Sequence, residues 1–217
     1  MRIGIELNGI IRNINEQILD YYVKDFDKTF DKDKVKLNRV NFIKQIPFKS
    51  QKDVDKFMYV DYPYEVFGCA GTCSMHLPNT INTWHKKNDK KIDLVVFSLM
   101  ESGLSIQSTY FFLSKIGCKI REAFFPKKAH EIWNKCDVVI TTNKDVVKSK
   151  PKYKKVVLIE KNDNKYLVKK ADLVYKNLDE VCNDKDFFKK IGKIKKPSKN
   201  NLWQTIKKLF TDGKSKN

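Results

Sequence analysis

The sequence predicts an α/β fold in which a parallel sheet carries helices on both faces. Short apolar runs of strand length recur along the chain, and segments with helical spacing of their apolar residues separate most of them. Strands that alternate with helices are typical of a parallel sheet covered on both sides. The composition is 41% hydrophobic and 12% aromatic, so the chain has enough apolar surface to form a buried core.

The strands follow from these apolar runs. The first is IGIELNGII at 3–11, and KIDLVVFSLM at 91–100 is apolar up to Ser98, as expected for a strand buried on both faces. Further strands are expected at 118–126, 137–142, 155–161 and 171–175.

Helical spacing predicts helices at 12–26, 77–87, 105–117 and 127–136, and we expect the first to pack on the first strand. The stretch 27–68 is polar, rich in aromatic residues and weakly periodic, which favours a small insertion that carries short helices. We expect the α/β domain to span 1–182, with the insertion over about 27–87. An insertion after the first strand-helix unit would lie above the carboxyl ends of the strands, where α/β folds bind ligands.

Residues 183–217 form a predicted basic tail. From residue 185 onward there are 11 Lys and 2 acidic residues, a net charge of +9. The segment NLWQTIKKLF at 201–210 has the spacing of a basic amphipathic helix, whose apolar residues are Leu202, Trp203, Ile206, Leu209 and Phe210. Such a helix lies on a membrane surface, fits a groove of a partner protein, or folds back on its own domain.

The formal net charge of +18 predicts attraction to nucleic acid, an anionic membrane surface or an acidic protein. Arg is scarce and no groove-entering motif is present, so any binding of nucleic acid would rest on non-specific charge. No apolar stretch reaches the roughly 18–20 residues of a transmembrane segment, and the N-terminus lacks the pattern of a signal peptide. We therefore expect a protein that is cytoplasmic when made, with its five cysteines reduced.

Three segments carry a resemblance to a known family: IGIELNGII at 3–11, DLVVFS at 93–98 and CDVVITTNKDVVKSKP at 136–151. In this order on successive strands, the chain resembles the haloacid dehalogenase-like (HAD-like) superfamily over about residues 1–178. It looks closest to the 5′-deoxyribonucleotidase-type branch. The resemblance implies a Rossmann-like sheet with a phosphate site at the carboxyl ends of its strands.

The resemblance also implies roles for two residues that close the first strand. In the family, one Asp attacks phosphorus and binds magnesium, and a second Asp two residues later acts as general acid and base. Glu6 and Asn8 stand at these positions. The longer side chain of Glu6 displaces its carboxylate, and Asn8 cannot exchange a proton at ordinary pH.

Other family positions are matched in part. Ser98 corresponds to the hydroxyl residue that holds phosphate, and Lys127 or Lys128 corresponds to the family's Lys. Where the family has acids for magnesium, this chain has Thr141, Thr142 and Asn143, with Asp145 slightly beyond. Neutral oxygens leave magnesium without charged ligands, although Glu6 and Asp145 together offer two carboxylates.

A zinc site is the other metal site that the sequence suggests. Cys69, Cys73 and His76 lie close together in CAGTCSMH, and His85 follows. The spacing of the two histidines is too long for the usual zinc finger, so we expect a loop whose thiols pack.

We interpret the chain as a catalytically inactive HAD-like scaffold without a cofactor, whose function is structural or in assembly. Protein partners, in a homo-oligomer or a larger assembly, follow from this interpretation. Analogy and composition suggest a bacteriophage tail or ring component that is incorporated in a virion. Two alternatives stay open: a magnesium-dependent 5′-nucleotidase-type phosphohydrolase that uses Glu6, and a nucleotide or phosphate binder that does not hydrolyse its ligand.

Overall fold

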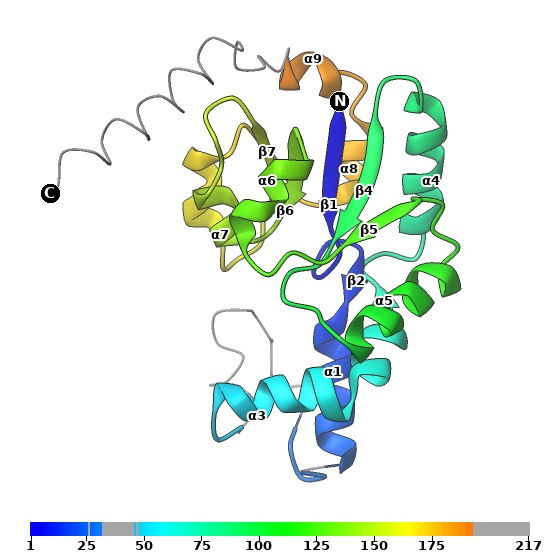
Figure 1. Ribbon diagram of the computed structural model, residues 1–217, viewed down its shortest axis with the longest axis vertical. Helices are drawn as coiled ribbons and strands as arrows, with labels where there is room; N and C mark the ends of the chain where they lie inside the picture. Colours follow the sequence, from blue (N-terminus) through cyan, green and yellow to red (C-terminus); the bar gives the residue numbers. More distant parts are fainter. Residues whose placement is uncertain (26, 32–45, 47, 193–217) are drawn as a thin grey trace, which may run out of the picture.

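The computed structural model describes residues 1–25, 27–31, 46 and 48–192. Its centre is a six-stranded sheet in the order β5-β4-β1-β6-β7-β8, in which every neighbouring pair is parallel (Figure 1). The strands are β1 (Arg2–Glu6), β4 (Asp93–Phe97), β5 (Glu122–Phe124), β6 (Val138–Thr141), β7 (Lys155–Ile159) and β8 (Leu173–Tyr175). The parallel α/β fold predicted from the sequence is confirmed.

One face of the sheet packs on four helices. Alternate strand residues such as Ile5, Val96 and Ile140 point into a fully buried apolar cluster on this face. The covering helices are α4 (Leu77–Asn88), α5 (Leu104–Lys115), α8 (Leu178–Asn183) and α9 (Phe187–Ile191). Burial of both sheet faces explains why the strand sequences are continuously apolar instead of alternating.

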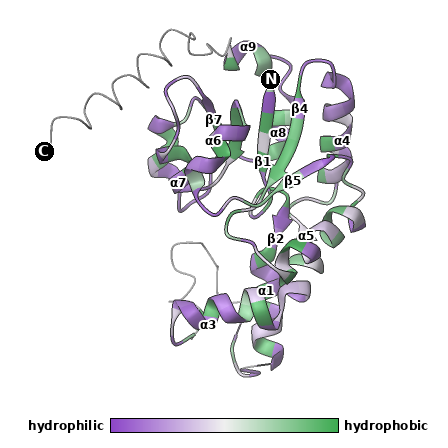
Figure 2. Ribbon diagram, viewed as in Figure 1, coloured by the Kyte–Doolittle hydropathy of each residue, from purple (hydrophilic) through white to green (hydrophobic). Residues whose placement is uncertain are grey.

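The other face carries a second cluster that includes Val95, Phe97 and Val139. It is covered by η4 (Ala129–Glu131), α6 (Ile132–Lys135), α7 (Lys144–Lys148) and η5 (Lys165–Lys170). Gly4 of β1 points to this face, where Cys136 is completely buried. The central strands are largely green in the hydropathy view, and the exposed side of α4 is largely purple (Figure 2).

A small helical unit with its own core lies beyond the carboxyl ends of the strands (Figure 1). It consists of α1 (Ile14–Asp25), α3 (Gln51–Lys56), η2 (Phe57–Asp61) and η3 (Tyr64–Gly68). Its buried residues include Ile18, Tyr22 and Phe57. Two short antiparallel strands, β2 (Arg12–Asn13) and β3 (Gly71–Thr72), connect the unit to the sheet.

The structure differs from the sequence prediction at two places. The residues that α1 buries belong to the core of the helical unit, because β2 directs the chain away from the sheet before the helix begins. The range 183–217 expected to be a tail contains α9, whose Phe187 and Ile191 are buried in the main core. Trp84 of α4 holds α9 there, with its ring centroid 5.6 Å from that of Phe187.

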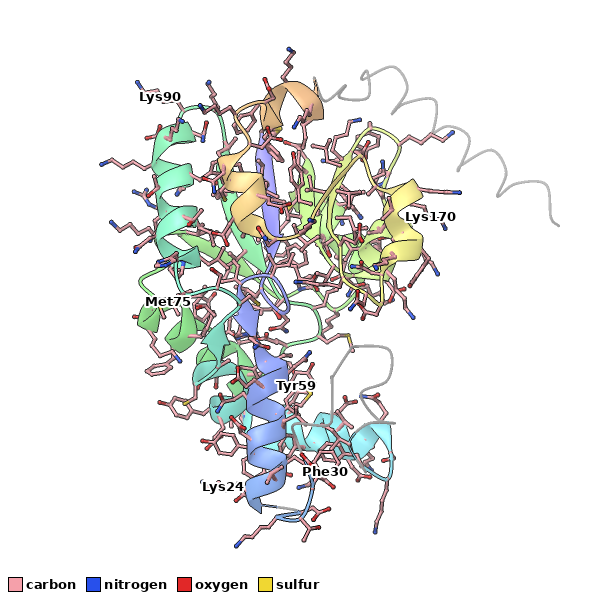
Figure 3. The ribbon with its side chains drawn as sticks, turned by 180° about the vertical axis from the view of Figure 1, so that it is seen from behind. Lys24, Phe30, Tyr59, Met75, Lys90 and Lys170 are labelled. Carbon is pink, nitrogen blue, oxygen red and sulfur yellow. The ribbon has the colours of Figure 1, made fainter. Side chains whose placement is uncertain are left out.

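Lysines are spread over the molecule. Figure 3 shows Lys90, after α4, and Lys170, at the end of η5, on opposite flanks of the sheet, and Lys24 on the helical unit.

Part of the predicted insertion (residues 32–45) and the predicted tail helix at 201–210 fall outside the described residues. Within the described ranges, the longest apolar helices are too short or too polar to cross a membrane.

Candidate functional site

The candidate site lies where three neighbouring parallel strands end. Glu6 is the last residue of β1, Ser98 follows β4, and Thr141 is the last residue of β6. Because β1 pairs with β4 on one side and β6 on the other, these residues share the carboxyl edge of the sheet. The three side chains are almost completely buried.

Residues at the end of β6 bind the carboxylate of Glu6. Its Oε2 accepts hydrogen bonds from the Thr141 hydroxyl (2.8 Å), the Thr142 backbone N–H (2.8 Å) and the Thr142 hydroxyl (3.1 Å). The Thr141 hydroxyl in turn accepts from the backbone N–H of Asn143 at 2.9 Å. The two threonines at the expected acid positions are therefore donors to the carboxylate of Glu6.

The side chain of Asn8 binds Ser98, directly after β4. Its Nδ2 donates to the Ser98 hydroxyl at 3.0 Å, and its Oδ1 accepts from Nε of Arg12 at 2.8 Å. The Ser98 hydroxyl donates to the carboxylate of Glu101. Asn8, at the expected acid and base position, and Ser98, at the expected phosphate position, thus bind each other and two further residues, Arg12 and Glu101.

Arg12 is the centre of this network, and its side chain has no exposed surface. Its guanidinium forms an ion pair with Glu101 and donates to the Thr109 hydroxyl at 2.5 Å and to the Phe67 carbonyl oxygen at 3.2 Å. Thr109 also donates to Glu101. Burial lowers the pKa of Arg12, and the charge of Glu101 opposes that shift.

The rings of Phe67 and Phe112 enclose the same guanidinium. The Cζ atom of Arg12 lies 4.9 Å from the centroid of the first ring and 5.4 Å from that of the second. Phe67 belongs to η3 of the helical unit, and Phe112 belongs to α5. Arg12 therefore ties the loop after β1, the helical unit and α5 together with charge-assisted hydrogen bonds and aromatic contacts.

Strained backbone positions Glu101. Met100, in the loop after β4, has a φ of 70°, a left-handed conformation that non-glycine residues rarely adopt. Its backbone N–H donates to the Pro126 carbonyl oxygen at 3.1 Å, and its side chain is 64% exposed. The turn at Met100 directs the next side chain, Glu101, into the interior.

The remaining predicted residues lie apart from this network. Lys127 and Lys128 are exposed, and in the described part of the chain their ammonium groups form no hydrogen bond or ion pair. Asp145 is exposed in the first turn of α7, where its backbone N–H is capped by Asn143. Among the residues that the structure describes, no three or more His, Cys, Asp or Glu are grouped so that they could hold a metal ion. This applies also to Cys69, Cys73 and His76.

Arg12, Glu101 and Thr109 were not predicted from the sequence as site residues. One signal was available: Arg12 follows the apolar residues of the first strand and is a rare Arg in a chain whose basic residues are nearly all Lys. An arginine in an apolar context requires a buried partner, because an unpaired buried charge is strongly unfavourable. Nothing in the sequence identifies Glu101 as that partner, since the two residues are far apart along the chain.

The fold and the three strand ends define an α/β protein with a parallel, Rossmann-like sheet. A scan against protein-family models and a search of curated proteins gave no match. Among solved structures, the chain is similar to a "putative beta-phosphoglucomutase" from Thermotoga maritima, with a TM-score of 0.53 and 15% identity. The match covers 84% of this chain and 96% of that one.

A second solved structure is a "putative haloacid dehalogenase-like hydrolase" from Burkholderia xenovorans LB400. Its TM-score is 0.52 at 6% identity, and the match covers 85% of this chain and 95% of that one. Both matches extend over most of both chains, so the HAD-like fold expected from the resemblance is confirmed. At these identities the likeness concerns the fold alone.

Proposed function

We propose that this chain is a non-catalytic HAD-like scaffold that acts by binding other protein chains. The observation that carries the proposal is the hydrogen bond between Asn8 and Ser98, which joins both side chains to the buried Arg12–Glu101 ion pair. The side chains at the positions of the family's general acid and of its phosphate-holding hydroxyl are thus hydrogen-bonded to each other. Ser98 and Glu101 are also shielded from solvent, with 0% and 3% exposure.

The surroundings of Glu6 support the same proposal, because they do not fit a magnesium ion. One oxygen of its carboxylate accepts three hydrogen bonds from Thr141 and Thr142. Magnesium is usually anchored by carboxylates in near-octahedral geometry, whereas these neighbours are neutral donors. Asp145, whose carboxylate could join Glu6 as a second ligand, is exposed on α7.

The finer setting is a component of a bacteriophage tail or ring. Its support is the lysine-rich composition and the analogy with other proteins that assemble in symmetric copies. Assignment to the 5′-deoxyribonucleotidase-type branch is likewise a proposal that rests on the resemblance of the strand-end segments.

An assay of phosphate release tests the proposal. Purified protein is incubated with magnesium and deoxynucleoside monophosphates, beside a Glu6→Gln variant and a protein-free blank. We expect wild type and variant to match the blank, and the wild-type mass in solution to rise with concentration. Magnesium-dependent release that Glu6→Gln abolishes would overturn the proposal in favour of a phosphohydrolase, an activity of the hydrolase class named for the Burkholderia neighbour.

The alternative of a binder without turnover makes a separate prediction. A nucleotide held at the strand ends would raise the melting temperature of the wild type, and both Ser98→Ala and Lys128→Ala would remove that rise. We expect no rise, because Ser98 is buried and hydrogen-bonded while Lys128 is exposed. A rise that both substitutions remove would favour the ligand-binding alternative.

A further inference from the structure

The outer face of α5 is uncharged and largely apolar. Leu104, Tyr110 and Phe111 are 56%, 52% and 43% exposed. No charged residue occurs in α5 before Lys115, in a chain of which 32% is charged. Leu104 and Phe111 are seven residues apart and so lie on the same side of the helix. White and green predominate along α5 in Figure 2.

The apolar surface continues onto the helical unit. The ring of Tyr64, which is 48% exposed, lies 5.2 Å from the ring of Phe111, measured between centroids. Gly68 lies beneath both rings, since a Cβ built on it would be 3.2 Å from Tyr64 and 3.3 Å from Phe111. We call Leu104, Phe111 and Tyr64 the α5 face. Exposed apolar side chains that share one surface in this way are typical of an interaction site.

The elements of the helical unit that pack against α5 carry the opposite charge to the whole chain. Residues 57–70, which include η2 and η3, contain Asp61 and Glu65 and no Lys or Arg. The whole chain carries +18. A basic partner with an apolar stripe would therefore match this surface in both hydropathy and charge.

The chain itself contains such a partner. Residues 193–217 hold eight Lys and one acidic residue, and Leu202, Ile206 and Phe210 repeat at intervals of four residues. As a helix, 202–210 would be about 13 Å long at 1.5 Å per residue, and the 12 residues of α5 span about 18 Å. The segment is thus short enough to lie along α5.

We infer that the α5 face binds the segment 201–210 of a second copy of this chain. The inference rests on the proposed function, since it names the partner of the scaffold. A second copy is favoured by the position of α9, from which residues 193–217 continue: α9 lies beside the amino terminus, whereas α5 lies beside the helical unit (Figure 1). A tail-to-face contact between copies is heterologous, so it produces rings or open chains.

The experiment uses full-length chains and a pair of complementary variants. The first, Phe111→Glu, places a charge in the α5 face; Leu104→Glu is a second face variant in case the first fails to fold. The other variant carries Ile206→Glu and Phe210→Glu in the tail. The matched control is Tyr166→Glu, at a tyrosine 58% exposed on η5, outside the α5 face. Mass is measured by light scattering over a concentration series.

We expect the wild type and Tyr166→Glu to assemble, and the face and tail variants each to stay at the monomer mass of 25.5 kDa. An equimolar mixture of a face variant and the tail variant should form a complex of two chains and no larger one, because each chain keeps one half of the contact. A mixture that stays monomeric, or a wild type that never assembles, would overturn the inference. Face variants that assemble like the wild type would also overturn it, yet leave the proposed function standing; phosphate release in the earlier assay would instead remove the proposed function.

Discussion

The guanidinium of Arg12 and the carboxylate of Glu101 form an ion pair in which neither side chain has any exposed surface. Removal of one partner leaves the other charge buried without compensation, and such losses typically amount to about 3–5 kcal/mol. We expect Arg12→Met to lower the free energy of unfolding by about that much in urea denaturation.

The exposed pair Lys56–Asp61 provides the control for this prediction. Lys56→Met breaks an ion pair whose lysine side chain is 63% exposed, and we expect a change below about 1 kcal/mol. The double variant Arg12→Met with Glu101→Leu should recover part of the loss, since no buried charge then remains. Equal effects of Arg12→Met and Lys56→Met would contradict the buried network.

Gly4 leaves room for the sulfur of Cys136. A Cβ built on Gly4 would lie 2.6 Å from that Sγ, so Gly4→Ala forces the neighbouring segment to shift. Overpacking of a well-packed core typically costs about 1–3 kcal/mol, and we expect a loss of this size in thermal or urea unfolding. Adding Cys136→Ala should make Gly4→Ala less harmful, because it removes the sulfur that the new methyl group meets.

A second glycine serves as the comparison for that substitution. A Cβ added to Gly71 in β3 would meet no heavy atom within 4 Å, so Gly71→Ala should leave stability nearly unchanged. A similar loss at both glycines would show that the close contact in the sheet is not the cause.

Because the backbone at Met100 is left-handed, a substitution there should raise stability instead of lowering it. Relief of this conformation by glycine is worth about 1–2 kcal/mol, and the added freedom of glycine in the unfolded chain offsets about 0.5–1 kcal/mol. Because Met100 is 64% exposed, its side chain loses little burial. We expect Met100→Gly to raise the melting temperature slightly and Leu99→Gly, one residue earlier, to lower it.

The decrease in the free energy of unfolding at acid pH should depend on Asp172. Burial alone would raise the pKa of Asp172, but hydrogen bonds from Lys150, the Val156 N–H and Lys155 outweigh it and place the pKa below its usual 3.8. A carboxylate whose pKa is depressed by folding stabilises the protein above the pKa of the unfolded state. That stabilisation is lost as the pH falls through the lower, folded-state value.

Asp172→Asn should therefore lower stability at pH 7 and flatten its decline below about pH 4, because the unfolded chain then takes up one proton less in that range. Urea denaturation at about pH 7, 5 and 3 measures both effects. Asp89→Asn makes the same replacement at an exposed position and should lower stability at pH 7 less than Asp172→Asn does. The prediction would be wrong if Asp172→Asn lost stability at acid pH as steeply as the wild type.

The sheet was predictable from the sequence because its strands are buried on both faces, and runs such as 94–97 are therefore apolar without interruption. The family resemblance singled out Glu6, Ser98 and Thr141 at the ends of their strands, and parallel strands place their carboxyl ends together. The partners of these side chains did not follow. Asn8 binds Ser98 across a separation of 90 residues, and only the packing of β1 against β4 decides that contact.

The helical unit was harder to predict for a different physical reason. Its core depends on aromatic side chains such as Tyr22, Phe48 and Phe57, which meet from separate short segments. Of these segments, α1 has clear helical spacing, but that spacing does not show which core the helix joins, so the sequence placed the start of the insertion at 27, after α1. The short strand β2, which diverts α1 from the sheet, has only two residues and leaves no apolar pattern.

The pairing of β2 with β3 also affects the order in which the chain can fold. β1 and β4 are neighbours in the sheet, yet the whole helical unit lies between them in the sequence. When Arg12 pairs with Thr72 and Asn13 with Gly71, the two ends of the helical unit are already joined. The loop that remains to be closed when β1 pairs with β4 is then much shorter. The entropy lost on loop closure then falls, and early formation of the small aromatic core would accelerate assembly of the central strands.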